Sequence, residues 1–374
     1  MPDPLRITIV QGAFLPVPPL LGGAVEKAWF ALGAAFADAG CEVTHVSRAH
    51  PQLPPQEHRA GVRHVRVAGF DTPRALWKLK LLDLRYSWRA RRVLPPAHIL
   101  ITNTFWLPLL ERRRSRGHLY VHVARYPKGQ LRFYPARAAL QTVSAPIRRA
   151  ILREVPGATD RVRVVPYPLA PAYLTPPTAA ENVILYAGRV HSEKGVHLLI
   201  EAFARLGAAG DGWRLRLVGP WETRHGGGGE TYRDELRRLA GPVAARVDFV
   251  GPVFDEAALV AHYRAAAVFC YPSLAERGET FGLAVLEAMG SGCTPVVSAL
   301  ECFRDFVVPR QNGLIFDHRA ADPVAALASA LGELAGDAQL RDRLRVAARQ
   351  SAGLYALPRV AQLYLDDFLR LRAN

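Results

Sequence analysis

Two glutamates in an otherwise apolar segment are the first residues whose spacing indicates chemistry. Seven uncharged residues separate Glu279 from Glu287, and the stretch from Phe281 to Met289 contains Glu287 as its one ionisable residue. We expect this run to be a buried helix, and a buried carboxylate is costly unless a partner binds it. Carboxylates accept hydrogen bonds from pairs of hydroxyls, such as those of a sugar or a ribose. The spacing therefore favours two separate hydrogen-bonding sites.

Other roles for these two acids stay open at this point. The acid and base of a glycosidase are disfavoured, because eight residues rise ~12 Å along a helix. The two carboxyls of a glycosidase lie only roughly 5 to 9.5 Å apart. In a purely structural alternative, Glu287 accepts from a backbone N–H and Glu279 is solvated.

A second segment, ILYAGRVHSEKGVHLLIEAF, places two cations between a strand and a helix. We expect the strand to end near Gly188 and the helix to begin near Gly195, with Arg189 and Lys194 in the turn. In open α/β sheets, ligands bind beyond the carboxyl ends of the strands, and a helix amino terminus attracts anions. Arg189 and Lys194 are therefore candidates for binding a diphosphate, and two solvated loop cations are the alternative.

Strands and helices alternate along both halves of the 374-residue chain. A buried strand at 6–12, a loop rich in Pro and Gly, a helix at 24–39 and a strand at 42–47 form a parallel α/β unit. The Pro-rich segment 164–182 has neither a helical nor a strand period, so we interpret it as a linker. The same alternation restarts after it, which predicts two doubly wound α/β domains.

A basic amphipathic helix is predicted over residues 74–92. Its apolar side chains share one face and its cations lie elsewhere: Trp77, Leu81, Leu84 and Trp88 against Lys78, Lys80, Arg85, Arg89 and Arg92. We expect the apolar stripe to face the core, with the cations extending past it to water. The alternative is a helix that lies on an anionic membrane surface.

Composition and motifs disfavour several classes of protein. No apolar run reaches the roughly 18 to 20 residues of a membrane span, and the first residues show no secretory signal pattern. The four cysteines have no metal-ligand spacing and an Asp-x-Asp signature is missing, so we expect reduced thiols, a cytoplasmic protein and no metal. A dehydrogenase is disfavoured, because no G-x-G-x-x-G follows a strand. The net charge of +15 suits an anionic partner, but no nucleic-acid-binding motif accompanies it, and we expect no nucleic acid.

Four segments, in order along nearly the whole chain, resemble the retaining glycosyltransferases of family four, which have the GT-B fold. ETFGLAVLEAM matches their E-x7-E signature, and AGRVHSEKGVHLLIEAF resembles their G-R-x4-K-G segment. VDFVGPV followed by YPS is similar to their base-binding region. LLGGAVEKAWFALGAAFADAGCEV is similar to their N-terminal glycine loop and first helix.

The resemblance implies a fold and a division of roles between domains. It implies two Rossmann-like doubly wound domains facing across a cleft: an acceptor domain at 1–168 and a nucleotide-sugar donor domain at 169–355. A final helix at 356–374 is expected to cross back to the N-terminal domain. The donor is a co-substrate, with UDP or GDP as the expected nucleotide, and no cofactor is implied. The acceptor is expected to be a sugar, a lipid-linked compound or a small molecule. We expect the enzyme to be cytoplasmic, with a peripheral location at the inner face of the membrane as the alternative.

The same resemblance assigns roles to residues of the donor domain. Arg189 and Lys194 would neutralise the diphosphate and stabilise the leaving group as charge develops. The N–H groups near Gly282 and Leu283 would contribute to the same site, and Val250 lies in the segment that meets the base. Glu287 would accept from the ribose hydroxyls, and Glu279 would face the donor sugar as a catalytic residue.

Residues of the N-terminal domain carry over less directly. Gly23 would let its loop approach the phosphates or the acceptor, because glycine allows close backbone approach. His122, at the end of a strand, is the expected catalytic histidine that touches the donor sugar, and a structural histidine is the alternative. Arg125 and Lys128 are candidates for phosphate or acceptor binding, with solvation as the alternative.

The predicted activity is a metal-independent, hexosyltransferase-type transfer with retention of the anomeric configuration. A nucleotide-sugar epimerase of the same fold is the alternative, and the E-x7-E pattern and the acceptor-side domain argue against it. The sequence does not identify the sugar, the base or the acceptor.

Overall fold

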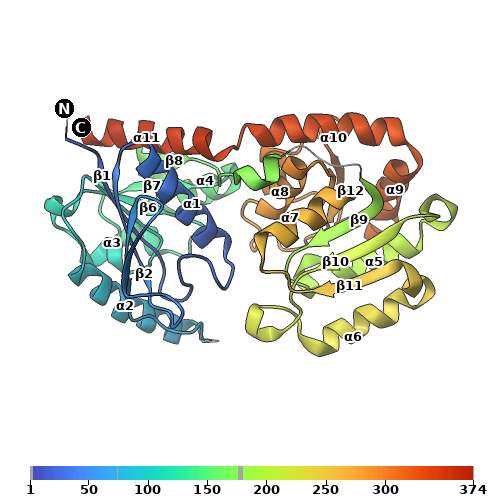
Figure 1. Cartoon of the computed structure of the whole chain (residues 1–374), viewed down its shortest axis with the longest axis horizontal. Helices are drawn as coiled ribbons and strands as arrows, with labels where there is room; N and C mark the ends of the chain where they lie inside the picture. Colours follow the sequence, from blue (N-terminus) through green and yellow to red (C-terminus); the bar gives the residue numbers. More distant parts are fainter. Residues whose placement is uncertain (1–2, 74, 176–179, 374) are drawn as a thin grey trace. The chain divides into compact units, whose positions relative to one another are not determined.

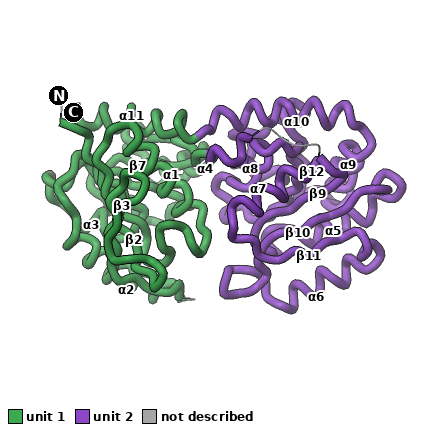
Figure 2. Tube along the Cα trace, in the orientation of Figure 1, with its two compact units in different colours: residues 1–168, 357–374 green, residues 169–356 purple. Residues whose placement is uncertain are grey.

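The computed structural model of the chain describes residues 3–73, 75–175 and 180–373. It divides into two compact units, each with its own sheet (Figure 2). Unit 1 is Met1–Pro168 with Leu357–Asn374, and unit 2 is Leu169–Ala356. The divisions expected from the sequence fall after residues 168 and 355.

Unit 1 is built on a sheet whose order is β3-β4-β2-β1-β5-β6-β7-β8, with every neighbouring pair parallel except β3 and β4. Its strands are β1 Arg6–Val10, β2 Glu42–Arg48, β3 Gln56–Arg59, β4 Val62–Val67, β5 Ile99–Thr102, β6 His118–His122, β7 Ala139–Thr142 and β8 Val162–Val164. The run of buried residues in β1 and β5 is the pattern expected of strands covered on both faces.

Helices cover both faces of the unit 1 sheet. They are α1 Ala24–Asp38, α2 Leu76–Arg92, α3 Leu107–Leu110, α4 Ala145–Glu154 and α11 Leu357–Ala373. On one face, Trp29 and Phe36 of α1 pack with Tyr364 and Phe368 of α11 against the sheet. The last helix of the chain therefore belongs to the core of unit 1, and both termini lie at the same end of that unit (Figure 1).

Unit 2 has a fully parallel sheet in the order β11-β10-β9-β12-β13-β14. Its strands are β9 Glu181–Ala187, β10 Arg214–Val218, β11 Val247–Gly251, β12 Ala266–Tyr271, β13 Thr294–Ser298 and β14 Leu314–Phe316. Its helices are α5 Val196–Ala204, α6 Gly229–Ala240, α7 Glu256–Ala265, α8 Leu283–Ser291, α9 Pro323–Gly336 and α10 Ala338–Gly353. The order reverses between β9 and β12, as in doubly wound sheets.

The orientation of α2 corrects the sequence-based expectation. Trp77, Leu81 and Trp88 were expected to face the core, and they are exposed. The face that is buried instead comprises Asp83, Tyr86, Ser87 and Ala90. Polar side chains turn inward here because the core of unit 1 provides backbone N–H donors for Asp83.

Three short strands, β3, β8 and β14, were not predicted. β3 (Gln56–Arg59) consists of polar residues, and it joins β4 through a two-residue turn at Ala60 and Gly61, both with positive φ. This turn lacks the Asn-Gly or Asp-Gly signal that usually marks such a hairpin. β14 is only three residues long, too short to show a period.

Candidate active site

The candidate site lies at the carboxyl ends of β9 and β12 in unit 2. These strands are neighbours in the sheet, and the strand order reverses between them. In doubly wound sheets this switch point opens a crevice in which ligands bind. The loop after β9 carries Arg189 and Lys194, and the loop after β12 carries Glu279 and Gly282.

The two loops are held against each other by their backbones. Leu274 N donates to Glu193 O over 2.8 Å. Gly195 begins α5 with φ +67°, and a Cβ on it would lie 2.1 Å from Pro272 O. Only glycine fits at this left-handed, crowded position, so the Lys-Gly pair brings the start of α5 next to the loop after β12.

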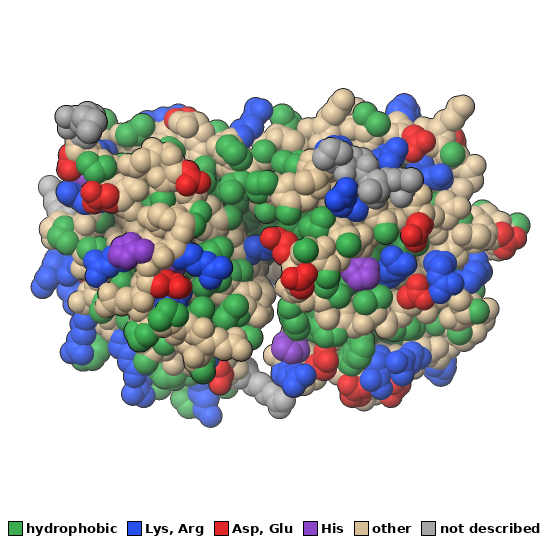
Figure 3. Space-filling view, viewed as in Figure 1, with side chains coloured by type: hydrophobic (Ala, Val, Ile, Leu, Met, Phe, Trp, Pro, Cys, Tyr) green, Lys and Arg blue, Asp and Glu red, His purple; other side chains and the backbone are tan. Residues whose placement is uncertain are grey.

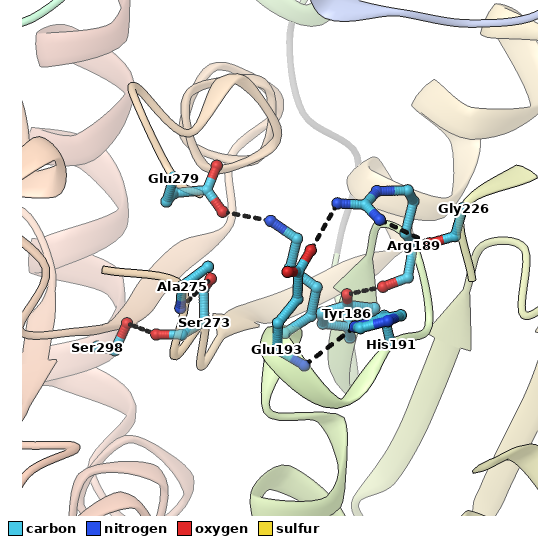
Figure 4. Close-up of polar contacts among 10 residues, drawn as sticks. Tyr186, Arg189, His191, Glu193, Gly226, Ser273, Ala275, Glu279 and Ser298 are labelled. Atoms are coloured by element: carbon cyan, nitrogen blue, oxygen red, sulfur yellow. Dashed lines mark hydrogen bonds and ion pairs between the residues drawn. The ribbon is translucent and has the colours of Figure 1, made fainter. Parts of the chain in front are cut away.

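Lys194 and Glu279 form an ion pair across this junction, with 2.7 Å between Nζ and Oε2 (Figure 4). Their side chains are only 6% and 11% exposed. The Lys194 Nζ also lies 5.6 Å from the centre of the Tyr271 ring, which stacks on Tyr186. A buried charge needs such partners, because desolvation without them is expensive.

Arg189 is the more exposed cation of the site. Its guanidinium donates to Gly226 O over 2.6 Å and to Glu193 Oε1 over 2.7 Å (Figure 4). Partial burial alone would raise the pKa of Glu193, but the hydrogen bond and charge of Arg189 hold that pKa below its ordinary value. Arg189 is therefore oriented by protein contacts, and its side chain is 43% exposed, so an anion can reach it.

The amino end of α8 completes the site. Gly282 caps the helix with φ +92°, and a Cβ there would lie 2.4 Å from Cε1 of the buried Phe303. The first N–H groups of a helix have no intrahelical acceptor and attract anions. The backbone N–H groups of Gly282 and Leu283 are such groups, and they follow Glu279 closely in the chain.

Glu287 lies one turn into α8 and is 6% exposed. Its carboxylate accepts a hydrogen bond from Tyr263 Oη at 3.3 Å. Burial, together with this carboxylate, raises the pKa of Tyr263 well above its ordinary value, so the phenol stays a neutral donor. Glu279 and Glu287 thus have different partners, a lysine for Glu279 and a tyrosine for Glu287.

The structure brings together Arg189, Lys194, Glu279 and the amino end of α8. Val250 is in β11, which is an edge strand of the same sheet, and it is 40% exposed. The predicted residues Gly23 and His122 belong to unit 1.

His122 lies buried at the carboxyl end of β6. Its ring nitrogens contact Gln141 Oε1 and Tyr167 Oη, and Trp29 packs edge-on against it. Burial lowers the pKa of His122 to about 4, although the Gln141 contact opposes this. The ring is thus neutral at pH 7 and engaged with protein groups, and its contact with a donor sugar stays a prediction.

Sequence reasoning missed Glu26, which lies in the first turn of α1 beside Gly23. A Cβ on Gly23 would lie 2.2 Å from Glu26 Oε2, so glycine at this position makes room for the carboxylate. Burial raises the pKa of Glu26 to about 7, while its own backbone N–H and Arg125 lower it. The signal in the sequence was an acid three residues after Gly23, in the first turn of an apolar helix.

Within residues 3–73, 75–175 and 180–373, no three His, Cys, Asp or Glu side chains gather in a way that could hold a metal ion.

Comparison with known families finds a match in the C-terminal half of the chain. Residues 176–351 match the family described as "Glycosyl transferases group 1". The chain is 31% identical over 188 residues to a phosphatidyl-myo-inositol mannosyltransferase of Mycolicibacterium smegmatis, covering 50% of this chain and 44% of that protein. It is 32% identical over 204 residues to a D-inositol 3-phosphate glycosyltransferase of a Nocardioides species, covering 51% and 42%. The matches thus span less than half of each relative.

Solved structures resemble the whole chain. Sucrose-phosphate synthase from Thermosynechococcus elongatus has a TM-score of 0.79 at 22% identity, covering 99% of both chains. Anabaena Alr3699/HepE, solved in complex with UDP and glucose, has a TM-score of 0.71 at 16% identity, covering 98% of this chain and 99% of that one. These similarities confirm the predicted GT-B class of fold, with two Rossmann-like α/β domains.

Proposed function

We propose that this protein transfers a sugar from a nucleotide-diphosphate sugar to a hydroxyl acceptor, with retention of the anomeric configuration. The observation that carries the proposal is the meeting of Arg189, Lys194 and the amino end of α8 at the switch point of unit 2. The relatives named above are transferases, which favours this reaction over the epimerase alternative.

The diphosphate of the donor fits the positive groups of this crevice. Arg189 offers a planar fork of donors, and Lys194 offers a compact charge. The N–H groups at the start of α8 add the positive end of a helix dipole. Lys194 pairs with Glu279 in the structure. We propose that, when the donor binds, Lys194 contacts a phosphate oxygen and the Glu279 carboxylate turns toward the sugar hydroxyls.

Glu287 is proposed to bind the ribose. A carboxylate offers about four acceptor sites, and the hydrogen bond from Tyr263 uses one of them. Val250, on the exposed carboxyl end of β11, is the proposed neighbour of the base, with UDP or GDP as the nucleotide. The structure of HepE contains UDP, which makes UDP the first nucleotide to test.

The chemistry we propose needs no covalent glycosyl-enzyme. The acceptor oxygen attacks the anomeric carbon on the face from which the diphosphate departs, and the bond between that carbon and the phosphate oxygen breaks. The acceptor proton passes to a phosphate oxygen of the leaving diphosphate. Arg189 and Lys194 stabilise the charge that develops there, so we expect chelators to leave activity intact.

The acceptor is proposed to bind unit 1, with the loop at Gly23 and the exposed Arg125 and Lys128 as its candidate contacts. Both relatives are named for inositol compounds that carry a phosphate. A phosphorylated polyol, free or lipid-linked, is therefore the acceptor class to test first, and His122 is proposed to face the donor sugar from the same unit.

Donor binding is tested by calorimetry with UDP and GDP. Lys194→Ala and Arg189→Ala should each lose about 1.5 to 3 kcal/mol of binding free energy, the range for a charge-assisted hydrogen bond. The matched control is Arg205→Ala, which removes an exposed arginine paired with Asp322 in the same unit. Unchanged affinity in both site variants would overturn the site.

Retention is tested by NMR of the anomeric proton in the product. A product with the donor's configuration is expected, in the presence and absence of a chelator. An inverted product would refute the mechanism, even where the donor site is correct.

A further inference from the structure

The outer face of α2 exposes a stripe of large apolar side chains. Leu76, Trp77, Leu81 and Trp88 are 68%, 66%, 51% and 49% exposed. Residues 77, 81 and 88 are four and seven positions apart, so at 3.6 residues per turn they lie along one line of the helix. Helices of globular proteins normally turn such a stripe toward the core, and a contiguous exposed one marks an interaction site.

The opposite face of α2 is fixed to unit 1, so the helix cannot rotate to bury the stripe. The Asp83 carboxylate accepts from the backbone N–H groups of Phe105 at 3.0 Å and Trp106 at 3.2 Å. The Trp106 indole donates in turn to Lys80 O over 2.8 Å. Tyr86 is completely buried in the core beneath. Rotation would break these contacts.

Cations flank the apolar stripe on both sides. At 100° per residue, Lys80 lies on one side of the Trp77–Trp88 line, and Lys78 and Arg85 lie on the other. Arg91 lies on the Lys80 side and pairs with the buried Glu111. The guanidinium carbon of Arg92 lies 3.3 Å from the centre of the Trp88 ring. Of the seventeen residues of α2, Asp83 alone is acidic, and it points inward. Figure 3 shows Lys and Arg side chains beside hydrophobic ones at the edge of unit 1 where α2 lies.

We propose that the outer face of α2 binds the surface of an anionic lipid bilayer. Lys and Arg are attracted to acidic headgroups, and tryptophan rings favour the boundary between headgroups and acyl chains. A nucleic acid would use the cations but would leave the apolar stripe in water. No helix among the described residues has the length and apolar character to cross a membrane, so contact is of the surface type. The inference is independent of the proposed glycosyl transfer.

The test is sedimentation of the full chain with vesicles. We expect binding to vesicles of phosphatidylcholine with phosphatidylglycerol, weaker binding at high salt, and little binding to phosphatidylcholine alone. Brominated acyl chains should quench tryptophan fluorescence. Lys78→Gln/Lys80→Gln should lower affinity about 10-fold or more, since each cation near such a surface contributes roughly fivefold. Trp77→Ala/Trp88→Ala should also lose binding and the quenching.

Matched controls separate this surface from general charge and apolarity. Arg237→Gln/Arg238→Gln removes two exposed cations of α6, and Leu363→Ala/Leu369→Ala removes two exposed leucines of α11. Both should bind vesicles like the wild type. UDP affinity should be unchanged in the α2 variants, because the donor residues lie in unit 2.

Three outcomes would overturn the proposal. The first is no binding of the wild type to anionic vesicles, and the second is equal binding by the α2 and control variants. The third is binding to an oligonucleotide or to an acidic polypeptide in place of vesicles, which would assign α2 to a different partner.

Discussion

Lys194 and Glu279 lie 85 residues apart in the chain and bond directly over 2.7 Å. Residue spacing predicted a role for each, a phosphate ligand and a sugar ligand, but could not predict that they pair. The pairing makes the charge of the crevice depend on the acid as well as on the two cations. It also explains how the loop after β12 keeps a nearly buried acid.

The two glutamates should respond differently to neutral substitution. Glu279→Gln should bind UDP at least as tightly as the wild type, because Lys194 keeps its charge and loses a neutralising partner. Its turnover should fall. Glu287→Gln should weaken UDP binding by about 1 to 2 kcal/mol, because an amide is a poorer acceptor for ribose hydroxyls. Calorimetry with UDP and single-turnover rates measure both.

A matched variant controls for local packing. Tyr263→Phe removes the hydrogen bond from the Tyr263 hydroxyl to Glu287 while keeping the ring, and it should lower stability more than UDP affinity. Equal losses of UDP affinity in Glu279→Gln and Glu287→Gln would contradict the division of roles.

At the scale of elements, two buried histidines join β2, β4 and α1. His45 and His64 are register partners whose rings stack with centroids 5.5 Å apart. Among the described residues, their ring nitrogens have no hydrogen-bond partner. Burial, followed by their mutual repulsion and Arg66, lowers the pKa of His45 well below its ordinary value. Burial and Arg66 likewise lower the pKa of His64 to about 4, although Glu57 opposes them.

These rings should make the fold less stable as the pH falls. Their pKa values are lower in the folded than in the unfolded state, so the unfolded state takes up protons first, from pH 6.5 downward. Each ring should lower the free energy of unfolding by about 1.5 kcal/mol between pH 6.5 and 5. Glu26 and Asp83, whose pKa values burial raises to about 7 and about 6, act in the opposite direction.

The test therefore compares slopes rather than absolute stabilities. His45→Phe/His64→Phe keeps two aromatic rings and removes both titrations. Urea unfolding between pH 7 and 5 should show a markedly smaller loss of stability on acidification in this variant than in the wild type. Some slope should remain, since His122 titrates in the same direction. Parallel curves for the two proteins would contradict the explanation.

At the scale of the whole molecule, the chain returns to its first unit at its end. Asp367 of α11 is 4% exposed and accepts from Tyr120 Oη at 2.9 Å and from Arg163 Nε at 3.0 Å. These bonds tie the last helix to β6 and β8. Asp367, near the end of the chain, thereby stabilises two strands from its first half.

Asp367→Ala should destabilise unit 1 by about 2 to 3 kcal/mol, because it leaves a buried tyrosine hydroxyl without its acceptor. Hydrogen exchange should show the loss of protection in β6 and β8 and no change in β9 and β12. The control is the adjacent Asp366→Ala, whose partner Gln362 is exposed, and it should change stability by less than about 0.5 kcal/mol. Loss of protection in unit 2 alone would contradict this assignment.

The sequence by itself determined the features that depend on neighbouring residues. The alternation of strands and helices predicted two doubly wound domains, and the Gly and Lys after β9 marked a strand-to-helix turn at a ligand-binding edge. Such features follow from periodicity and backbone conformation, which act over a few residues. The polar hairpin strand β3 lacked that periodic signal and was missed.

Only the tertiary structure decided the features that depend on distant residues. It paired Lys194 with Glu279, because the strand order makes β9 and β12 neighbours. It turned Asp83 inward and Trp77 outward, although the hydrophobic pattern of α2 predicted the reverse, because backbone donors near residue 105 hold the carboxylate. A hydrophobic pattern identifies the two faces of a helix, but the partners that the fold provides decide which face is buried.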